Sequence, residues 1–322
     1  MAFRTKTVKG KKYFYFDISY FVSNKSKTFS KYIGANKPPK KDAAKIRSSF
    51  KSEIIERLAG KHYDNELISK DDLIRALLFR EAFNETFSSL SRSKQRKYEI
   101  DKTILFTLTT LTTEDVDVDI RDVKNAMEKE SRLNMRERIS KNMLDAVESI
   151  KKGRTLDKEY LLDLHKTIMG GFEDKNPGRT RKQQVYLHMR NTADFASREI
   201  AYRPPHHAKI SRLIDEFVNW HNSTKLNPIE KAALAHYKLY KIHPFLDGNK
   251  RICRLVLNKT LLDNGFPLLN ISAKRERYFQ SLIDSVKKDA PQRLAEFTLK
   301  EFFRQTKEFL TLHGKTERNA SK

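Results

Sequence analysis

The sequence predicts a mainly helical protein that begins with a short β-hairpin, and three observations support this prediction. Residues 12–33 are rich in aromatic and β-branched residues and contain the turn-forming segment SNKSK, as expected for two antiparallel strands. From about Asp42 onward, apolar residues recur every three and four positions, which is typical of amphipathic helices. Gly34 and the Pro38-Pro39 pair separate the two patterns, because these residues continue neither kind of element.

The composition is that of a globular protein. The chain has 322 residues, of which 38% are hydrophobic and 33% are charged. Cys253 is the single cysteine, which excludes an intrachain disulfide framework and a cysteine-rich zinc site. No apolar run approaches the roughly 20 residues that span a bilayer, and the first residues lack the apolar stretch of a signal peptide. We therefore expect a cytoplasmic protein without a membrane partner.

The net charge of the chain is strongly positive and unevenly distributed. The formal net charge is +24, and the first 60 residues contain 15 Lys and Arg against 4 Asp and Glu. Such a surplus suits a polyanion, so the N-terminal region is a candidate for binding nucleic acid. A lysine-rich solvated surface is the alternative explanation. The aromatic run Tyr13 to Phe16 is likewise open to two interpretations, the core of the hairpin or a platform on which bases stack.

The segment HPFLDGNKRICR, residues 243–254, carries the clearest functional signal. A helix is predicted over 228–242, with Asn227 as N-cap, Pro228 at its first position and Glu230 completing a capping box. Pro244 ends this helix, and a second helix begins near Asn249. The loop between them therefore leads into a helix N-terminus, where free N–H groups and the helix dipole attract anions.

The side chains of this segment suit a nucleotide with magnesium. Arg251, Arg254 and Asn258 share one face of the second helix and are expected to converge on one anion. Gly248 allows the backbone to approach a phosphate closely, and Asp247 is suited to a divalent metal whose other ligands are phosphate oxygens and water. His243 is suited to accepting a proton from a hydroxyl group.

At these residues the chain resembles the Fic family, whose signature is H-P-F-x-(D/E)-G-N-(G/K)-R-x-x-R. The resemblance extends over about residues 95–305, where RKQQVYL is similar to the strand of the family's flap. It implies a Fic-type helical bundle with a small β-hairpin flap, in a domain of residues 95–310 with a core of about 155–265. A basic β-hairpin module (1–36) and a linker and helical region (37–94) would precede this domain, and a mobile tail (311–322) would follow it.

The resemblance implies ATP and Mg²⁺ as cofactors and a target protein, docked on the flap, as partner; a homo-oligomer is compatible with it. His243 would deprotonate a Ser, Thr or Tyr hydroxyl of the target, and Asp247 would bind Mg²⁺. Tyr278 would contact the adenosine. The remaining implied contacts are an anion hole from Gly248, Asn249 and Lys250, phosphate contacts from Arg251 and Arg254, and alignment of the target main chain by Val185, Tyr186, Leu187 and His188.

Two motif positions favour different reactions. Lys250 resembles Doc-type members of the family, which transfer the γ-phosphate of ATP, whereas Arg254 is typical of members that transfer AMP. We favour a protein adenylyltransferase that releases pyrophosphate. A Doc-like phosphotransferase is the first alternative, and a nucleic-acid-binding regulator with a Fic core is the second.

The family's inhibitory glutamate is missing from its expected position. Many members carry (S/T)-x-x-x-E-(G/N) before an LTxxEV segment, and residues 111–116, LTTEDV, resemble the latter. In this register Thr107 occupies the position of the glutamate, which in the family pairs with the motif's second arginine. Glu99 or Glu114 would take the role in another register.

Overall fold

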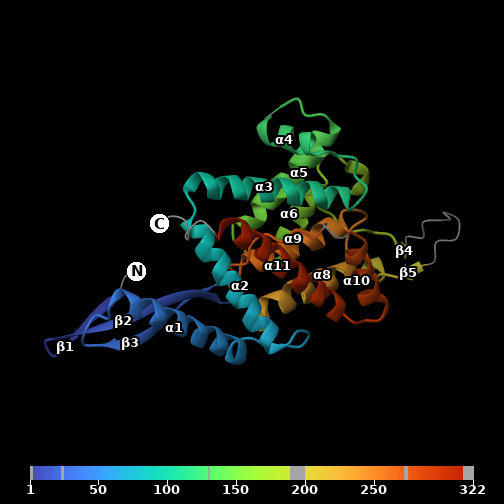
Figure 1. Cartoon of the computed structure of the whole chain (residues 1–322). Coiled ribbons are helices and arrows are strands. Elements are labelled where there is room, and N and C mark those ends of the chain that lie inside the picture. Colours follow the sequence, from blue (N-terminus) through green and yellow to red (C-terminus); the bar gives the residue numbers. More distant parts are fainter. Residues whose placement is uncertain (1–2, 23–24, 130, 189–199, 272–274, 315–322) are drawn as a thin grey trace.

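A computed structural model describes residues 3–22, 25–129, 131–188, 200–271 and 275–314 of the chain. It is mainly helical, as predicted, with a β-sheet at the N-terminus (Figure 1). No helix in the described ranges is long and apolar enough to cross a membrane.

The N-terminal sheet has three antiparallel strands in the order β1-β2-β3, one more than the predicted hairpin. They are β1 (Arg4–Val8), β2 (Lys11–Val22) and β3 (Lys25–Gly34). The sequence pattern missed β1 because all five of its residues are exposed, so it shows no alternation of apolar and polar residues. A tight turn joins β1 to β2, in which both Lys9 and Gly10 have positive φ, as two-residue hairpin turns require.

One face of this sheet packs against helix α1 (Lys40–Lys61). Phe16, Tyr20 and Phe29 are buried in a cluster with Phe50 and Ile54 of that helix. Helix α2 (Lys70–Ser89) then leads into the helical body (Figure 1). Phe16 therefore belongs to the core, whereas Tyr13 and Tyr15 alternate to the opposite face of β2.

The helical body is built around α8 (Pro228–Ile242) and α9 (Asn249–Leu262), which pack side by side and are buried along almost their whole length (Figure 1). The other helices are α3 (Arg92–Thr112), α4 (Ile120–Glu128), α5 (Met135–Lys151), α6 (Lys158–Ile168), α7 (Ile210–Ser223), α10 (Arg275–Lys287) and α11 (Gln292–His313). Two 3₁₀ turns, Glu173–Lys175 and His207–Lys209, and two short strands, β4 (Leu187–His188) and β5 (Ile200–Tyr202), complete the described elements. Helix α11 continues to His313, and residues 315–322 of the tail expected from residue 311 lie outside the described ranges.

Helix α8 has the predicted bounds, but Glu230 has another role than the predicted one. Asn227 caps the helix by accepting a hydrogen bond from the Glu230 N–H at 3.0 Å, as expected. The fully buried carboxylate of Glu230 accepts hydrogen bonds of 2.8 to 3.2 Å from the backbone N–H groups of Glu66, Leu67 and Ile68. Glu230 thus anchors the segment between α1 and α2 to the helix that leads into the HPFLDGNKRICR loop.

Candidate active site

The loop between α8 and α9 is shaped by two residues with left-handed backbone conformations. His243 ends α8 with φ of 48°, and Gly248 precedes α9 with φ of 73°. A Cβ atom at Gly248 would lie 3.0 Å from Sδ of Met169, a tight contact, and the positive φ of this position also favours glycine. The side chain of Asn249 closes the loop, because it accepts a hydrogen bond from the N–H of Phe245 at 2.9 Å and donates one to its carbonyl at 2.8 Å.

His165 of α6 packs against this loop and forms a hydrogen bond with it. Its ring stacks on Phe245 with centroids 3.7 Å apart, and its Nδ1 accepts a hydrogen bond from the N–H of Gly178 at 3.0 Å. Nε2 therefore carries the ring proton and donates to the carbonyl of Asp247 at 3.1 Å. Burial lowers the pKa of His165 to about 4, so the ring is neutral near pH 7 and acts as a positioning residue.

Arg181 connects the loop to the flap. Its buried guanidinium donates to the carbonyls of His243 at 2.8 Å, Gln183 at 2.8 Å and Pro205 at 2.6 Å. Its backbone N–H also donates to the carbonyl of Pro244 at 2.9 Å. One side chain thus fastens both ends of the flap to the residues that end α8.

The flap is a two-stranded antiparallel hairpin of β4 and β5, in agreement with the predicted strand (Figure 1). Leu187 pairs with Tyr202, and His188 pairs with Ile200. Val185 and Tyr186 precede the strand, and the ring of Tyr186 is exposed beneath the guanidinium of Arg203. Residues 189–199, which connect the two strands in the sequence, lie outside the described ranges.

His243 is buried and uncharged. Burial lowers its pKa to about 4, a change that the Tyr240 backbone partly opposes and that Arg181 and Lys250 reinforce. Only 8% of the residue is exposed, and its Nδ1 has no hydrogen-bond partner in the described part of the chain. A neutral imidazole with a free nitrogen can accept a proton, as the prediction for His243 requires.

Asp247 and Arg251 lie together where α9 begins. An Nη atom of Arg251 is 3.3 Å from Oδ1 of Asp247, and the N–H of Gly248 donates to the same oxygen at 2.5 Å. The Asp247 side chain is half exposed, whereas Arg251 is buried. One carboxylate therefore remains accessible beside the N–H groups of the first turn of α9, which have no acceptors within the helix.

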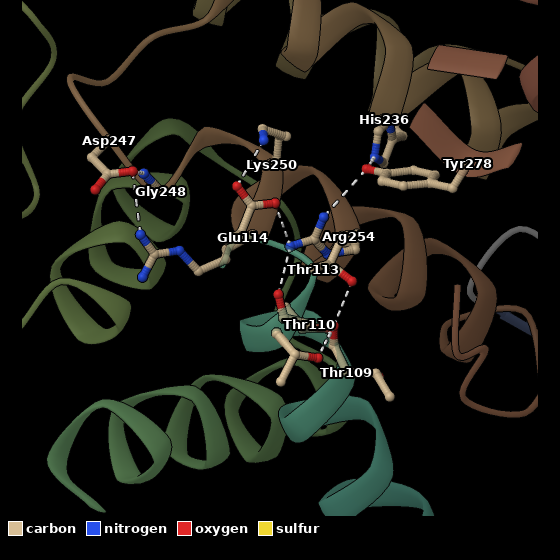
Figure 2. A network of polar contacts seen from close by, with 12 residues as sticks. Thr109, Thr110, Thr113, Glu114, His236, Asp247, Gly248, Lys250, Arg254 and Tyr278 are labelled. Carbon is tan, nitrogen blue, oxygen red and sulfur yellow. Dashed lines mark hydrogen bonds and ion pairs between the residues drawn. The ribbon is translucent and has the colours of Figure 1, made fainter. Parts of the chain in front are cut away.

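Glu114 pairs with both other cations of the motif. It lies in the turn directly after α3, and its carboxylate is 2.9 Å from Nζ of Lys250 and 2.9 Å from Nη2 of Arg254 (Figure 2). Burial works to raise the pKa of Glu114, but Arg254 and Lys250 outweigh it and lower the pKa to about 2. Nη2 of Arg254 also donates to the carbonyl of Thr110 at 3.0 Å. Glu114 thus forms ion pairs with two of the three cationic side chains of HPFLDGNKRICR.

Residues 155–261, which contain all of this loop, match the family model described as Fic/DOC family. This segment is a Fic/DOC domain. The relatives include proteins named protein adenylyltransferase Fic from Drosophila erecta, 36% identical over 126 residues, and Drosophila willistoni, 35% identical over 126 residues. Each alignment covers 38% of this chain and 23% of the relative, so the chain matches less than a quarter of the length of these proteins.

Two solved structures share the fold. A Fic family protein from Desulfovibrio desulfuricans has a TM-score of 0.63 and 18% identity, over 78% of this chain and 77% of that one. Fic-1 from Caenorhabditis elegans has a TM-score of 0.62 and 20% identity, over 87% of this chain and 79% of that one. At these identities the likeness concerns the fold, which is therefore a Fic fold.

Tyr278 of α10 and His236 of α8 are buried next to Arg254 (Figure 2). The Tyr278 hydroxyl accepts a hydrogen bond from Nη1 of Arg254 at 3.4 Å and lies 2.8 Å from Nε2 of His236. The structure thus places Tyr278 where it positions Arg254, and its ring has no exposed surface. Contact between Tyr278 and adenosine stays a prediction.

Asn258 does not join the anion site that the sequence predicted for it. Its amide nitrogen donates to the carbonyls of Arg254 at 3.1 Å and Leu269 at 3.0 Å, and its oxygen accepts from the N–H of Leu269 at 2.7 Å. Asn258 therefore fastens the segment after α9 to the helix. The sequence correctly predicted that Asn258 lies near Arg254 on one helix face. It did not predict that backbone groups would bind the Asn258 amide.

Within residues 243–254, three buried nitrogens have no hydrogen-bond partner among the described residues: Nδ1 of His243, Nε of Arg251 and Nε of Arg254. Nδ1 of His236 on α8 is a fourth in the Fic/DOC segment. Buried polar groups are nearly always paired, so the two arginine Nε–H donors fit a ligand with several acceptors, such as a nucleotide phosphate chain. No cluster of three or more metal-binding side chains occurs within the described ranges. Asp247 nevertheless fits Mg²⁺, which is usually bound by one or two carboxylates together with phosphates and water.

The buried histidines predict that the protein loses stability in mild acid. Burial lowers the pKa to about 4 in His165 and His243 and to about 3 in His221 and His236, from an ordinary 6.5. Between these values the unfolded chain binds more protons than the folded one, so protonation favours unfolding. From pH 7.5 to 5.5 we expect the free energy of unfolding to fall by about 1 kcal/mol per histidine at most. Urea unfolding at both pH values measures this, and equal or greater stability at pH 5.5 would contradict the neutral assignments.

Proposed function

We propose that this protein is a protein adenylyltransferase, which transfers AMP from ATP to a hydroxyl group of a target protein and releases pyrophosphate. The observation that carries the proposal is the group of three unpartnered nitrogens, on His243, Arg251 and Arg254, around the N-terminus of α9. Together they supply a base and two phosphate-binding cations. The names of the relatives, protein adenylyltransferase Fic, support the same activity.

The residues divide the work of a substitution at phosphorus. Neutral His243 accepts the proton of the target hydroxyl, whose oxygen forms a bond to the α-phosphorus while the bond to the bridging oxygen of pyrophosphate breaks. The N–H groups at the start of α9, with Gly248 allowing close approach, bind the phosphate oxygens. Arg251 and Arg254 neutralise the charge that develops on pyrophosphate. Mg²⁺ bound to Asp247 would add further charge neutralisation.

The flap provides the place for the target. The hairpin of β4 and β5 has two strands, so each strand has an outer edge to which an extended segment of another protein can add by main-chain hydrogen bonds. Arg181 fixes the flap relative to the carbonyl of His243. A hydroxyl on the added segment would thereby be presented close to the base.

Lys250 supports transfer of the γ-phosphate as the second candidate function. In the described structure its ammonium pairs with Glu114 and lies 4.8 Å from the centroid of the Phe279 ring. Lys250 is therefore directed toward the cluster of Arg254 and Glu114. We favour AMP transfer because Arg254 is present and positioned by Tyr278, Thr110 and Glu114.

Glu114 restrains this activity in our proposal. Its carboxylate accepts hydrogen bonds from Lys250 and Arg254, so a phosphate chain must displace it before it can use these two cations. Thr107, which occupies the family's expected inhibitory position, is buried on α3, and Glu99 is exposed. Of the acids considered from the sequence, Glu114 is the one that contacts the second arginine.

The small product of the reaction distinguishes the two transfers. With ATP, Mg²⁺ and target protein, AMP transfer releases pyrophosphate and phosphate transfer releases ADP. We expect pyrophosphate in an amount equal to the modified protein. ADP in that amount would instead establish the Doc-like reaction.

A further inference from the structure

The N-terminal sheet carries a concentration of positive charge that the Fic domain does not use. Residues 1–37 contain nine Lys and Arg and one acid, Asp17. Asp17 forms an ion pair with Arg4, whose Nε lies 2.6 Å from the Asp17 carboxylate. On β3, Lys31 pairs with Glu53 of α1 at 2.7 Å. These two ion pairs leave the lysines around the turn between β1 and β2 without acidic neighbours.

Four exposed lysines cluster at this turn: Lys6, Lys9, Lys11 and Lys12. None of their side chains has a hydrogen bond or an ion pair with any residue in the described ranges. The turn lies at the end of the sheet farthest from the helical body (Figure 1). Like charges this close repel one another, and a polyanion would remove the repulsion.

The face of the sheet that points away from α1 adds three tyrosines to this charge. Strand pairing places Tyr13 opposite Lys6, and Tyr15 opposite both Arg4 and Tyr32. Directly paired residues share one face, so these five side chains form a single surface, which we call the outer face. Tyr32 is 55% exposed, and its ring centroid lies 6.0 Å from that of Tyr13 and 5.5 Å from that of Tyr15.

The outer face is better suited to binding phosphates than to stacking on bases. The rings of Tyr13 and Tyr15 are tilted against Tyr32, and the Arg4 guanidinium lies 4.9 Å from the centroid of the Tyr15 ring. These contacts hold the rings against one another, so they are not open platforms for unpaired bases. Tyrosine hydroxyls, lysines and arginines are common partners of the phosphates of duplex DNA.

We propose that the outer face and the lysine-bearing turn bind double-stranded DNA. Beyond the pair Phe14–Gly34, only β1 and β2 continue toward the turn, as a two-stranded ribbon. The B-form major groove admits a two-stranded ribbon, whereas side chains cannot read the deep, narrow major groove of duplex RNA. Lysines on both sides of the turn then contact the phosphates that line the groove. The sequence pattern left nucleic acid and a merely solvated surface as alternatives for this region; the free lysines and the tyrosine cluster on one face favour the former.

Fluorescence anisotropy of a labelled mixed-sequence 24-base-pair duplex, titrated with the full-length protein in 50 to 300 mM KCl, tests this proposal. The triple variant Lys6→Gln, Lys11→Gln and Lys12→Gln should bind at least tenfold more weakly at low salt. Its log–log dependence of affinity on salt should become less steep by about 2 to 3 units, since each phosphate contact contributes about 0.9. The double variant Tyr15→Ala and Tyr32→Ala should weaken binding several-fold with an unchanged salt slope.

Matched controls separate a site from general charge. Lys124, Lys300 and Lys307 are exposed on α4 and α11, and their combined replacement by Gln removes the same charge as the triple variant of the sheet. We expect this control to bind DNA nearly as well as the parent chain. An equal loss in the control, absent DNA binding at 50 mM KCl, or equal affinity for single-stranded DNA, duplex RNA or anionic vesicles would overturn the proposal. His243→Ala should keep full DNA binding, so this result is independent of the proposed transferase activity.

Discussion

Replacing His243 by alanine is expected to lower the rate of AMP transfer by about 10²–10⁴-fold, the usual contribution of a general base. The side chain is neutral and buried, and its Nδ1 has no hydrogen-bond partner among the described residues. The affinity for ATP should change little, because the phosphate contacts come from α9. Single-turnover rates with labelled ATP, together with calorimetric ATP binding, measure the two effects separately.

His207→Ala provides the control for this experiment, since His207 lies in the 3₁₀ turn before α7, outside the loop. We expect the His207 variant to keep the parental rate. If the His243→Ala variant were active, His243 would not be the general base. A variant that has also lost ATP binding would show that the ring acts by maintaining the loop.

Replacing Glu114 by glutamine is expected to raise the efficiency of AMP transfer by about 10- to 100-fold. Hydrogen bonds to charged groups contribute about 1.5–3 kcal/mol each, and 1.4 kcal/mol corresponds to tenfold. The change releases Lys250 and Arg254, so the phosphates of ATP no longer compete with a carboxylate. The measurement is kcat/KM for ATP, with Kd from calorimetry. Because two buried or half-buried cations lose their partner, the variant should also unfold at a lower temperature, and ATP should restore much of this loss.

Glu99→Gln is the matched control, because Glu99 is an exposed acid on α3. It should leave both activity and stability unchanged. If Glu114→Gln lowered the activity, Glu114 would act in positioning Arg254 for catalysis, and the restraint that we propose would be wrong. If both variants behaved alike, the ion pairs of Glu114 would have no bearing on ATP.

The sequence was informative where chemistry and local structure coincide. Pro228 and Pro244 bound one helix, so the place of the loop followed from backbone preferences, and the residue types in HPFLDGNKRICR identified its character. These features depend on residues within one turn or two of each other.

What the sequence could not supply depends on contacts over long sequence separations. His165 and Arg181 are 82 and 62 residues from the loop residues they contact. A single sequence contains no signal for such pairs. An arginine or histidine among apolar residues in the sequence indicates only that the side chain needs a buried polar partner, not which one. Glu230 is a local prediction that a distant contact overturned. Its spacing from Asn227 suggested a capping box, but its carboxylate binds backbone N–H groups more than 160 residues away in the sequence.

Strand β1 illustrates a different cause. Its five exposed residues carry no alternating pattern, because the strand lies at the edge of a sheet that packs only one face against α1. Pairing with β2 alone defines it. The same exposure leaves Lys6 of this strand available, which links the missed strand to the DNA-binding surface that we propose.

Parallel incubation of the protein with ATP labelled at the α-phosphate and ATP labelled at the γ-phosphate tests the central claim most directly. Glu114→Gln is the best form for this experiment, because its Arg254 and Lys250 are free to bind phosphates, and Glu114→Gln combined with His243→Ala is its control. We predict that label from the α-phosphate becomes attached to protein, that label from the γ-phosphate does not, and that the double variant transfers neither. Attachment of the γ-label alone, or α-labelling that persists without His243, would contradict the account.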